Sequence, residues 1–316
     1  MKKTFSIVVP VYQNEPNLDD TIPAILEFSQ KLEHYETELI FVDDGSTDNS
    51  YPILLKYQSQ HPSQIKILRL TRNFGQNPAS CAGFAYAKGD VIGRISADLQ
   101  DPVELFDSMI KIWESGCKLV VACREGREET GVGSVLSNYV HIIIKKHINY
   151  RYPKGGFDFF LFDREVSNRI VSIAEKNSHL PSLLMYLGYR HQEIPYVRRK
   201  RLKGVSQYTL ARKIKVLIDI FITNSYLPVR FISIAGGITI LISLLFILIT
   251  IFGRNNEFSI SHSTAVFLLC FIGGVILLAL GIIGEYLWRI FENTKKRPLY
   301  VVEERVGFQH EPLYKS

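Results

Sequence analysis

The sequence predicts an α/β domain with a mainly parallel sheet, followed by two transmembrane helices. Short β-branched runs such as residues 5–11 (FSIVVPV) alternate with helical patterns along the first half of the chain. This alternation is typical of a parallel sheet covered by helices on both faces. Two later stretches, residues 231–252 and 264–284, contain no charged residue. Each is long enough to cross a hydrocarbon core of about 30 Å as a helix.

The strands are expected to follow one another at short intervals, each leading into a loop and a helix. In a parallel sheet the carboxyl ends of the strands share one edge, so polar residues that follow the strands should form a single pocket. A small-residue helix suited to close packing is expected at residues 79–87. The predicted strands are residues 5–11, 38–42, 65–70, 90–95 and 118–122.

An acidic stretch, RISADLQDP, follows the fourth predicted strand and spans residues 94–102. Carboxylate and amide oxygens at a strand end suit a hard divalent cation that sits on a diphosphate. An acidic turn with a helix cap explains the same residues without any chemistry. For an isolated Asp-x-x-Asp-Pro pattern that structural explanation is the better one, and the polar clusters at the neighbouring strand ends shift the balance towards a pocket.

Two adjacent carboxylates follow the second predicted strand, in the sequence VDDGSTD. Asp43 and Asp44 can hydrogen-bond a nucleotide base or ribose, and Tyr12, which follows the first strand, can stack on a base. Adjacent aspartates before Gly45 are equally well explained as turn and cap residues. Both interpretations stay open for these residues taken alone.

Charge and cysteine usage indicate a protein at the cytosolic face of a membrane. The net charge is +6, and basic residues flank the two apolar stretches, whereas the loop at 253–263 holds only Arg254 and Glu257 as charged residues. By the positive-inside rule, both chain ends are cytoplasmic. The four cysteines show no metal-ligand spacing and are expected to be reduced thiols. Without interleaved aromatic residues, the basic clusters favour anionic lipid over nucleic acid as a partner.

Several motifs occur together in one order along the chain. They are IVVPVYQNEPNL, FVDDGSTDNS, LTRNFGQNPA, ADLQDP, GGFDFFLFDREV and RLKGVSQYTL, followed by GEYLWRIFE and KKRPLYVVEE. In this combination the sequence resembles the bacterial polyprenyl-phosphate glycosyltransferases. These are similar to the dolichyl-phosphate mannose synthases and belong to the large inverting family two with a GT-A fold. The resemblance covers essentially the whole chain, whereas VDDGS alone would indicate only the wider superfamily.

The resemblance implies transfer of a sugar from a nucleotide-sugar donor, with UDP-hexose favoured, to polyprenyl phosphate with inversion at the anomeric carbon. It also implies a divalent cation, Mg²⁺ or Mn²⁺, at the donor diphosphate. Asp98 and Gln100 match the metal positions, and Ser96 stands where the family usually has an aspartate, so one charged ligand is missing. The residues assigned to the donor nucleotide are Pro10, Tyr12, Glu15, Asp43, Asp44 and Arg72.

The acceptor side is assigned to residues further along the chain. Asp158 lies among aromatic residues, and the resemblance places it near the acceptor phosphate as a base or a positioning group. A phosphate acceptor is largely ionised near neutral pH, since its second pKa is about 6, so we expect Asp158 to act mainly by positioning. Asp98 and Asp158 are the expected catalytic residues. Guanidinium and hydroxyl groups suit phosphate oxygens, and the residues assigned to phosphate and acceptor binding are Arg124, Arg127, Arg201 and Ser206.

The predicted organisation has four parts. We expect a multi-pass protein of the bacterial inner membrane that forms a homo-oligomer and makes a lipid-linked monosaccharide for a cell-envelope glycan. The parts are a cytosolic catalytic domain at 1–208, a juxtamembrane amphipathic helix at 209–228, a transmembrane hairpin at 229–288 with helices at about 231–252 and 264–287, and a cytosolic tail at 289–316.

Two alternative functions are compatible with parts of this pattern. One is a non-catalytic membrane scaffold with a degenerate metal motif, for which Ser96 is the evidence. The other is a glycosyltransferase that acts on a different membrane acceptor. The scaffold is disfavoured because the other expected site residues are all present, namely Asp43, Asp98, Gln100, Asp158 and Arg201.

Overall fold

The computed structural model divides into two compact units, Met1–Lys213 with Pro298–Ser316, and Ile214–Arg297. The predicted amphipathic helix at 209–228 and the site residues Arg127, Arg201 and Ser206 lie outside the described residues. The structure describes residues 2–124, 152–153, 156–173, 179–199, 262–295 and 297–308, together with isolated positions between 232 and 241.

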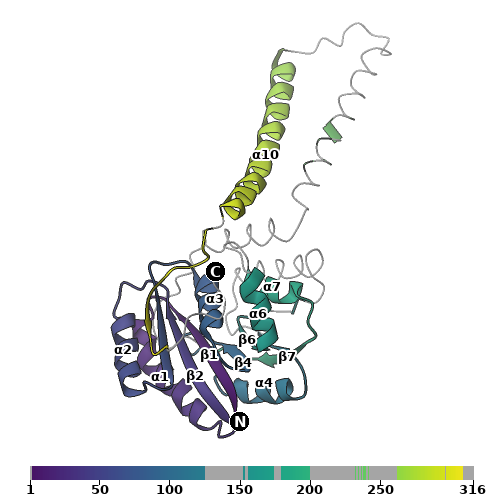
Figure 1. Cartoon of the computed structure of the whole chain (residues 1–316). Coiled ribbons are helices and arrows are strands. Elements are labelled where there is room, and N and C mark those ends of the chain that lie inside the picture. Colours follow the sequence, from purple (N-terminus) through teal and green to yellow (C-terminus); the bar gives the residue numbers. More distant parts are fainter. Residues whose placement is uncertain are drawn as a thin grey trace. The chain divides into compact units, whose positions relative to one another are not determined.

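The first unit is built on an eight-stranded sheet within the described residues (Figure 1). Its order is β7-β5-β6-β4-β1-β2-β3-β8. The strands β6 and β8 run antiparallel to their neighbours, and the others share one direction. The prediction of a mainly parallel sheet with five early strands is confirmed. The strands are β1 (Lys3–Val11), β2 (Tyr35–Asp43), β3 (Ile65–Leu70), β4 (Val91–Arg94), β5 (Leu119–Arg124), β6 (Phe159–Asp163), β7 (His191–Tyr196) and β8 (Val302–Val306).

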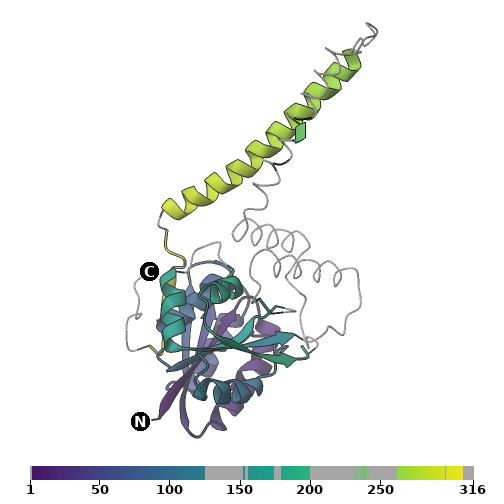
Figure 2. The ribbon, with the colours of Figure 1, turned by 90° about the vertical axis from the view of Figure 1, so that its right-hand side faces the viewer.

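Helices pack on both faces of this sheet, because alternate residues of each buried strand point to opposite sides (Figures 1 and 2). On one face, Ile7 and Val9 of β1 join a core that includes apolar residues of α1, α2 and α4. On the other face, α3 lies so close that a Cβ on Gly83 would be 2.3 Å from Val8 Cγ1. The described helices of this unit are α1 (Glu15–Gln30), α2 (Ser50–Gln60), α3 (Gln76–Tyr86), α4 (Leu105–Glu114), α6 (Arg164–Ile173) and α7 (Leu180–Tyr186).

Strand β6 was not predicted, although its apolar character was noted. Its residues do not alternate between apolar and polar because both faces of the strand are covered, and Phe159 to Phe162 are fully buried. The strand lies between β4 and β5 and runs against both, with Phe160 opposite Arg94 and Phe159 opposite Ala122. The start of β6 therefore lies at the edge where the parallel strands end, and it brings Asp158 to that edge.

Strand β8 was not predicted either, because it lies within residues 289–316, for which a tail was expected. It pairs antiparallel with β3 and forms the outer strand of the sheet. Just before it, the backbone oxygen of Val301 accepts a hydrogen bond from the Thr71 N–H at 3.0 Å. Just after it, Phe308 packs edge-on against Tyr86 with ring centroids 5.2 Å apart. The chain thus returns to the sheet of the first unit after the second unit.

The second unit contains one described helix, α10 (His262–Thr294). Within it, Phe271–Trp288 is long and apolar enough to cross a membrane, and it is the one such segment among the described residues. Many of its described apolar side chains are exposed, and Leu277, for example, is 71% exposed. The other predicted span, at 231–252, lies outside the described residues apart from isolated positions.

Candidate active site

The candidate site lies at the edge of the sheet where the parallel strands end. The register places Val11 beside Asp43 and Arg124 beside Tyr196 at the last positions of their strands, and Arg94 ends β4. Ligands of open α/β sheets bind outside this edge. The structure thus brings residues from six parallel strands and from the start of β6 to one side of the sheet.

Asp43 ends β2 and is fully buried. Its Oδ1 accepts a hydrogen bond from the Ser46 N–H at 3.2 Å, whereas Oδ2 has no hydrogen-bond partner among the described residues and lies 3.8 Å from Arg69 Nε. Burial raises the pKa of this carboxyl, and the Ser46 hydrogen bonds and Arg69 offset only part of that rise. Asp43 is therefore a buried carboxylate at the end of β2, with one oxygen held by the loop that follows and the other facing Arg69.

Asp44 holds two loops together. Its two carboxylate oxygens accept hydrogen bonds from the backbone N–H groups of Phe74, at 2.7 Å, and Gly75, at 2.8 Å. These contacts fasten the loop after β3 to the loop after β2, which is the turn-type role that the sequence left open. Arg72, in the loop so held, is exposed and stacks its guanidinium 4.1 Å from the centre of the Phe74 ring.

Gly45 is required where these two loops meet. Its φ is +67°, and a Cβ there would lie 2.5 Å from the backbone carbonyl carbon of Arg72. We expect Gly45→Ala to lower the free energy of unfolding by roughly 2–4 kcal/mol, the sum of left-handed strain and a backbone clash. Gly116→Ala is the matched control, since φ is +98° there and nothing lies within 4 Å. It should cost about 1 kcal/mol, and equal losses of melting temperature for the two variants would contradict this explanation.

The loops after β1 and β2 are also joined. Glu15, which begins α1, accepts hydrogen bonds from the backbone N–H of Asn49 at 3.1 Å and from its side-chain amide at 2.9 Å. The Gln13 N–H donates to Ser46 Oγ at 3.0 Å, and Gln13 has the uncommon φ of 48°. Glu15 thus holds the loops after β1 and β2 together. Pro10, on β1, and Tyr12, in the loop that follows β1, are both half-buried.

The acidic stretch after β4 forms a tight loop rather than the first turn of a helix, since α4 begins only at Leu105. Asp98 is buried, and its Oδ1 accepts the Gln100 N–H at 3.3 Å. Leu99 between them has φ of 52°, a conformation that costs an apolar L-residue roughly 1 kcal/mol and that clusters at functional sites. The same loop is also tied to α1, because Thr21 Oγ1 donates a hydrogen bond to the Ala97 carbonyl oxygen at 3.0 Å.

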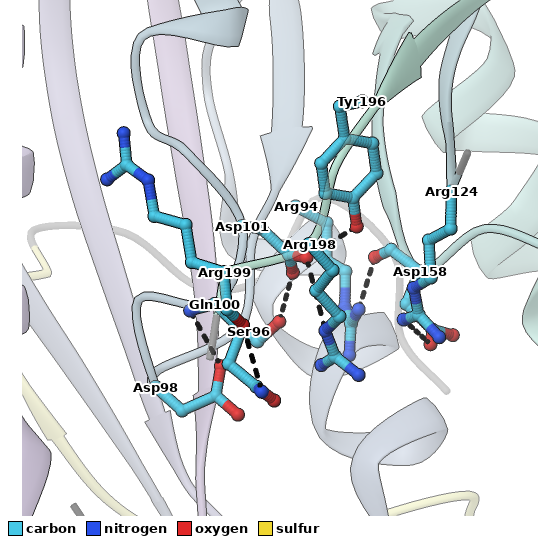
Figure 3. Close-up of polar contacts among 10 residues, drawn as sticks. All are labelled: Arg94, Ser96, Asp98, Gln100, Asp101, Arg124, Asp158, Tyr196, Arg198 and Arg199. Carbon is cyan, nitrogen blue, oxygen red and sulfur yellow. Dashed lines mark hydrogen bonds and ion pairs between the residues drawn. The ribbon is translucent and has the colours of Figure 1, made fainter. Parts of the chain in front are cut away.

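Asp101 anchors this loop. Its carboxylate accepts hydrogen bonds from the Ser96 hydroxyl and, at 2.5 Å, from the Tyr196 hydroxyl at the end of β7 (Figure 3). Arg198 Nε lies 3.7 Å from the same carboxylate. Asp101 therefore has a structural role, and because its carboxylate accepts the hydrogen bond that the Ser96 O–H donates, the lone pairs of the Ser96 oxygen stay available.

The residues of this loop fit a divalent cation that takes most of its ligands from a bound diphosphate. They offer the Asp98 carboxylate, the Ser96 hydroxyl oxygen and the Gln100 amide, whose nitrogen donates to the Arg199 carbonyl oxygen at 3.3 Å. The described residues contain no group of three or more His, Cys, Asp or Glu side chains that could hold a metal alone. This suits Mg²⁺-type ions, which commonly bind one or two carboxylates together with substrate phosphates.

Asp158, just before β6, pairs with Arg124 at the end of β5, with Arg124 Nη2 2.7 Å from Asp158 Oδ2 (Figure 3). Burial alone would raise the pKa of the Asp158 carboxyl, but surrounding cations led by Arg124 and Arg94 outweigh burial and lower that pKa to about 2. The Asp158 side chain is 35% exposed, so water screens part of this field. The carboxylate is ionised throughout the neutral range.

Two cationic side chains near Asp158, those of Arg94 and Arg198, were not predicted from the sequence. Arg94 is buried, and its Nη1 donates to the backbone oxygen of Asp158; an arginine inside the apolar run VIGRI was the signal that could have identified it. Arg198, in the basic run that follows β7, lies beside Asp101 and adds positive charge near Asp158. Among the described residues, Arg198 Nε and Arg124 Nε are buried without a hydrogen-bond partner. The site thus has more cationic groups than the sequence predicted.

Comparisons with known proteins identify the family of this chain. The model of the family "Glycosyl transferase family 2" matches residues 6–171. A Bacillus subtilis protein, uncharacterized glycosyltransferase YkcC, is 34% identical, with 99% of this chain and 97% of that protein covered. The SfII prophage-derived bactoprenol glucosyl transferase of Shigella flexneri is 31% identical, with 95% of this chain and 97% of that protein covered.

Similarity to solved structures is lower. The mannosyltransferase PcManGT from Pyrobaculum calidifontis, solved with GDP-Man and Mn²⁺, superposes with a TM-score of 0.47 at 13% identity, covering 92% of this chain and 88% of that one. The family match covers the strands β1 to β6 and the loops that form the site, and the mixed, mostly parallel sheet is the GT-A, Rossmann-like arrangement. The chain is a glycosyltransferase that belongs to glycosyl transferase family 2.

Proposed function

We propose that this glycosyltransferase transfers a sugar, with UDP-hexose as the favoured donor, to polyprenyl phosphate, with inversion at the anomeric carbon. The observation that carries the proposal is the pairing of an acidic loop, Ser96 to Asp101, with a cationic group around Asp158 at one sheet edge. The first suits a metal and diphosphate, and the second suits a phosphate acceptor. Relatives named bactoprenol glucosyl transferase, similar over 94–95% of this chain, support the same acceptor.

On the donor side, Tyr12 and Pro10 face the base and Arg72 reaches the nucleotide. Asp43 supplies the hydrogen-bond acceptor below the base, and Asp44 and Glu15 hold the loops that form this side. Asp98 and Gln100 hold the divalent cation, with Ser96 as a neutral third oxygen. That ion, when bound, neutralises the negative charge that develops on the leaving diphosphate.

On the acceptor side, Arg124 binds the lipid phosphate, with Arg94 and Arg198 adding positive charge nearby. A phosphate monoester has a second pKa of about 6 and is largely ionised at neutral pH. Asp158, with its pKa lowered to about 2, is a weak base. Asp158 therefore orients Arg124 and the acceptor for in-line attack and removes no proton. Arg127, Arg201 and Ser206 complete this side of the proposed site.

The proposed setting is the cytosolic face of the bacterial inner membrane. The apolar span Phe271–Trp288 supports membrane insertion, and the charge distribution of the sequence supports a two-helix hairpin with both ends in the cytoplasm. The amphipathic helix at 209–228 would lie at the interface, and a homo-oligomer is part of this proposal. The product would be a lipid-linked monosaccharide for a cell-envelope glycan.

A donor panel tests the function directly. Membranes that contain the full-length protein should form a lipid-linked sugar from one of a set of labelled UDP- and GDP-sugars when polyprenyl phosphate is present. Control membranes without the protein should form none. If no donor in the panel is consumed, the proposed pairing of a UDP-sugar or GDP-sugar with polyprenyl phosphate is wrong. If the label enters a different membrane acceptor, the assignment of the acceptor is wrong.

Metal dependence gives a further expected result. A chelator should reduce transfer by at least about 100-fold, because the leaving diphosphate would lose the charge stabilisation that a bound ion supplies. Addition of Mn²⁺ or Mg²⁺ in excess of the chelator should restore activity. Full activity in chelator would contradict the assignment of Asp98 and Gln100 as metal-holding residues.

A further inference from the structure

Arg69 links the donor side of the proposed site to the last strand of the sheet. It lies on β3 opposite Asp43 of β2, and its Nε is 3.8 Å from Asp43 Oδ2. The same Nε is 3.6 Å from Glu303 Oε2, at the β8 edge of the sheet. Its guanidinium also lies over the Tyr51 ring of α2, 4.4 Å from the ring centre. One cation is therefore shared between a fully buried carboxylate and an exposed one.

The charge state of Asp43 matters for the donor. Uracil and guanine both present a ring N–H, and a carboxylate can accept a hydrogen bond from it, whereas a protonated carboxyl loses part of this acceptor capacity. Burial favours the protonated form of Asp43, and the nearby Asp48 favours it further. Arg69 is the cation that opposes both effects.

We propose that Arg69 is a positioning residue for the donor, which keeps Asp43 ionised as a hydrogen-bond acceptor, and that Glu303 of β8 moderates this effect by competing for Arg69. The proposal rests on the proposed function, since it concerns the donor nucleotide of that reaction. It gives the strand that follows the membrane helix a part in donor recognition. No motif of the sequence assigned a role to Arg69 or Glu303.

The two residues should act with opposite signs. Loss of the cation at Arg69 raises the pKa of Asp43 further, so Asp43 becomes protonated at a higher pH. Loss of Glu303 leaves Arg69 to Asp43 alone, so Asp43 stays ionised to a lower pH. The other titratable groups near Asp43 and Arg69 keep their side chains in both variants; they are Asp48 of the loop, Tyr51 of α2 and Glu304 of β8, which lies opposite Arg69. A merely structural role would weaken binding in both variants.

The test uses full-length protein in detergent, with UDP and GDP as probes in titration calorimetry and the donor panel for kinetics. Arg69→Gln should weaken nucleotide binding by up to roughly tenfold on the acid side of the pH profile, where a shift of about one pKa unit at Asp43 has its full effect. In the pH profile of kcat/KM for the donor, the fall on the acidic side (the acid limb) should move to higher pH. At saturating donor, kcat should change by less than about twofold. Arg69→Lys, which keeps the charge, should recover most of the affinity.

Glu303→Gln should move the acid limb to lower pH and leave binding at neutral pH equal to or tighter than that of the wild type. Arg305→Gln is the matched control on β8, because Arg305 lies against Tyr86, with its guanidinium 6.0 Å from the ring, and it should shift nothing. Unchanged affinity and pH dependence in Arg69→Gln would overturn the proposal, as would shifts of the same sign in the Arg69 and Glu303 variants. If the wild-type protein neither binds nucleotide nor forms lipid-linked sugar, the proposed function itself fails.

Discussion

Asp98→Asn should lower turnover by about 100-fold or more while the protein stays in the membrane fraction. Asp98 is the one carboxylate that the acidic loop offers to a cation, because Ser96 is neutral and Asp101 is held by Ser96 and Tyr196. With no second carboxylate to compensate, the loss of its charge removes most of the protein's hold on the ion at the leaving diphosphate.

The measurement is the initial rate of lipid-linked sugar formation at saturating donor, with Mn²⁺ varied. Asp107→Asn is the control, because Asp107 is an exposed carboxylate on α4 that pairs with Lys111, at 2.6 Å, within its own helix. It should keep full activity. Activity like that of the wild type in Asp98→Asn would contradict the assignment of the leaving-group site, and rescue by high Mn²⁺ would support it.

Asp158→Asn should lower kcat by roughly 10- to 100-fold and change the affinity for the donor nucleotide by less than about twofold. The substitution keeps the size of the side chain but removes the charge that holds Arg124. Because the pKa of Asp158 lies at about 2, the carboxylate is ionised at every pH used for the assay. The rate deficit should therefore be the same at about pH 6 and about pH 8.

A double-mutant cycle with Arg124→Met separates positioning from other roles. If Asp158 acts by orienting Arg124, the double variant should be little worse than Arg124→Met alone. Additive losses would instead show that the two side chains act independently. A selective loss of nucleotide binding in Asp158→Asn would place this residue on the donor side and would contradict the proposed division of the site.

The early strands and the edge that carries the site could be predicted because both depend on local patterns. Buried runs such as residues 38–42 mark strands, and the polar residues that follow them mark their ends. Strand order depends on contacts between distant segments, and no period in the sequence encodes it. This is why β6, inserted between β4 and β5, and β8, paired with β3, were both missed.

The same limit applies to individual side chains of the site. Asp98 and Asp158 were identified because each stands in a motif, whereas Arg94, Tyr196 and Arg198 act through partners far along the chain. Tyr196, on β7, donates a hydrogen bond to Asp101, which lies 95 residues earlier in the sequence. Local patterns also left two roles open for Asp44, and its hydrogen bonds to the Phe74 and Gly75 amides show that it supports the loop. Its role in donor binding stays a prediction.

The position of β8 has a consequence for biosynthesis. Ribosomes deliver the chain from its N-terminus, and domains generally begin to fold as they emerge. The outer edge of β3 pairs with Val302–Val306, and this segment is translated only after the apolar helix α10. Until then the nascent catalytic sheet presents an open edge, which is a site for pairing with other chains. Translation of the apolar helix thus always precedes completion of the sheet, and a chain released early would carry an unfinished sheet.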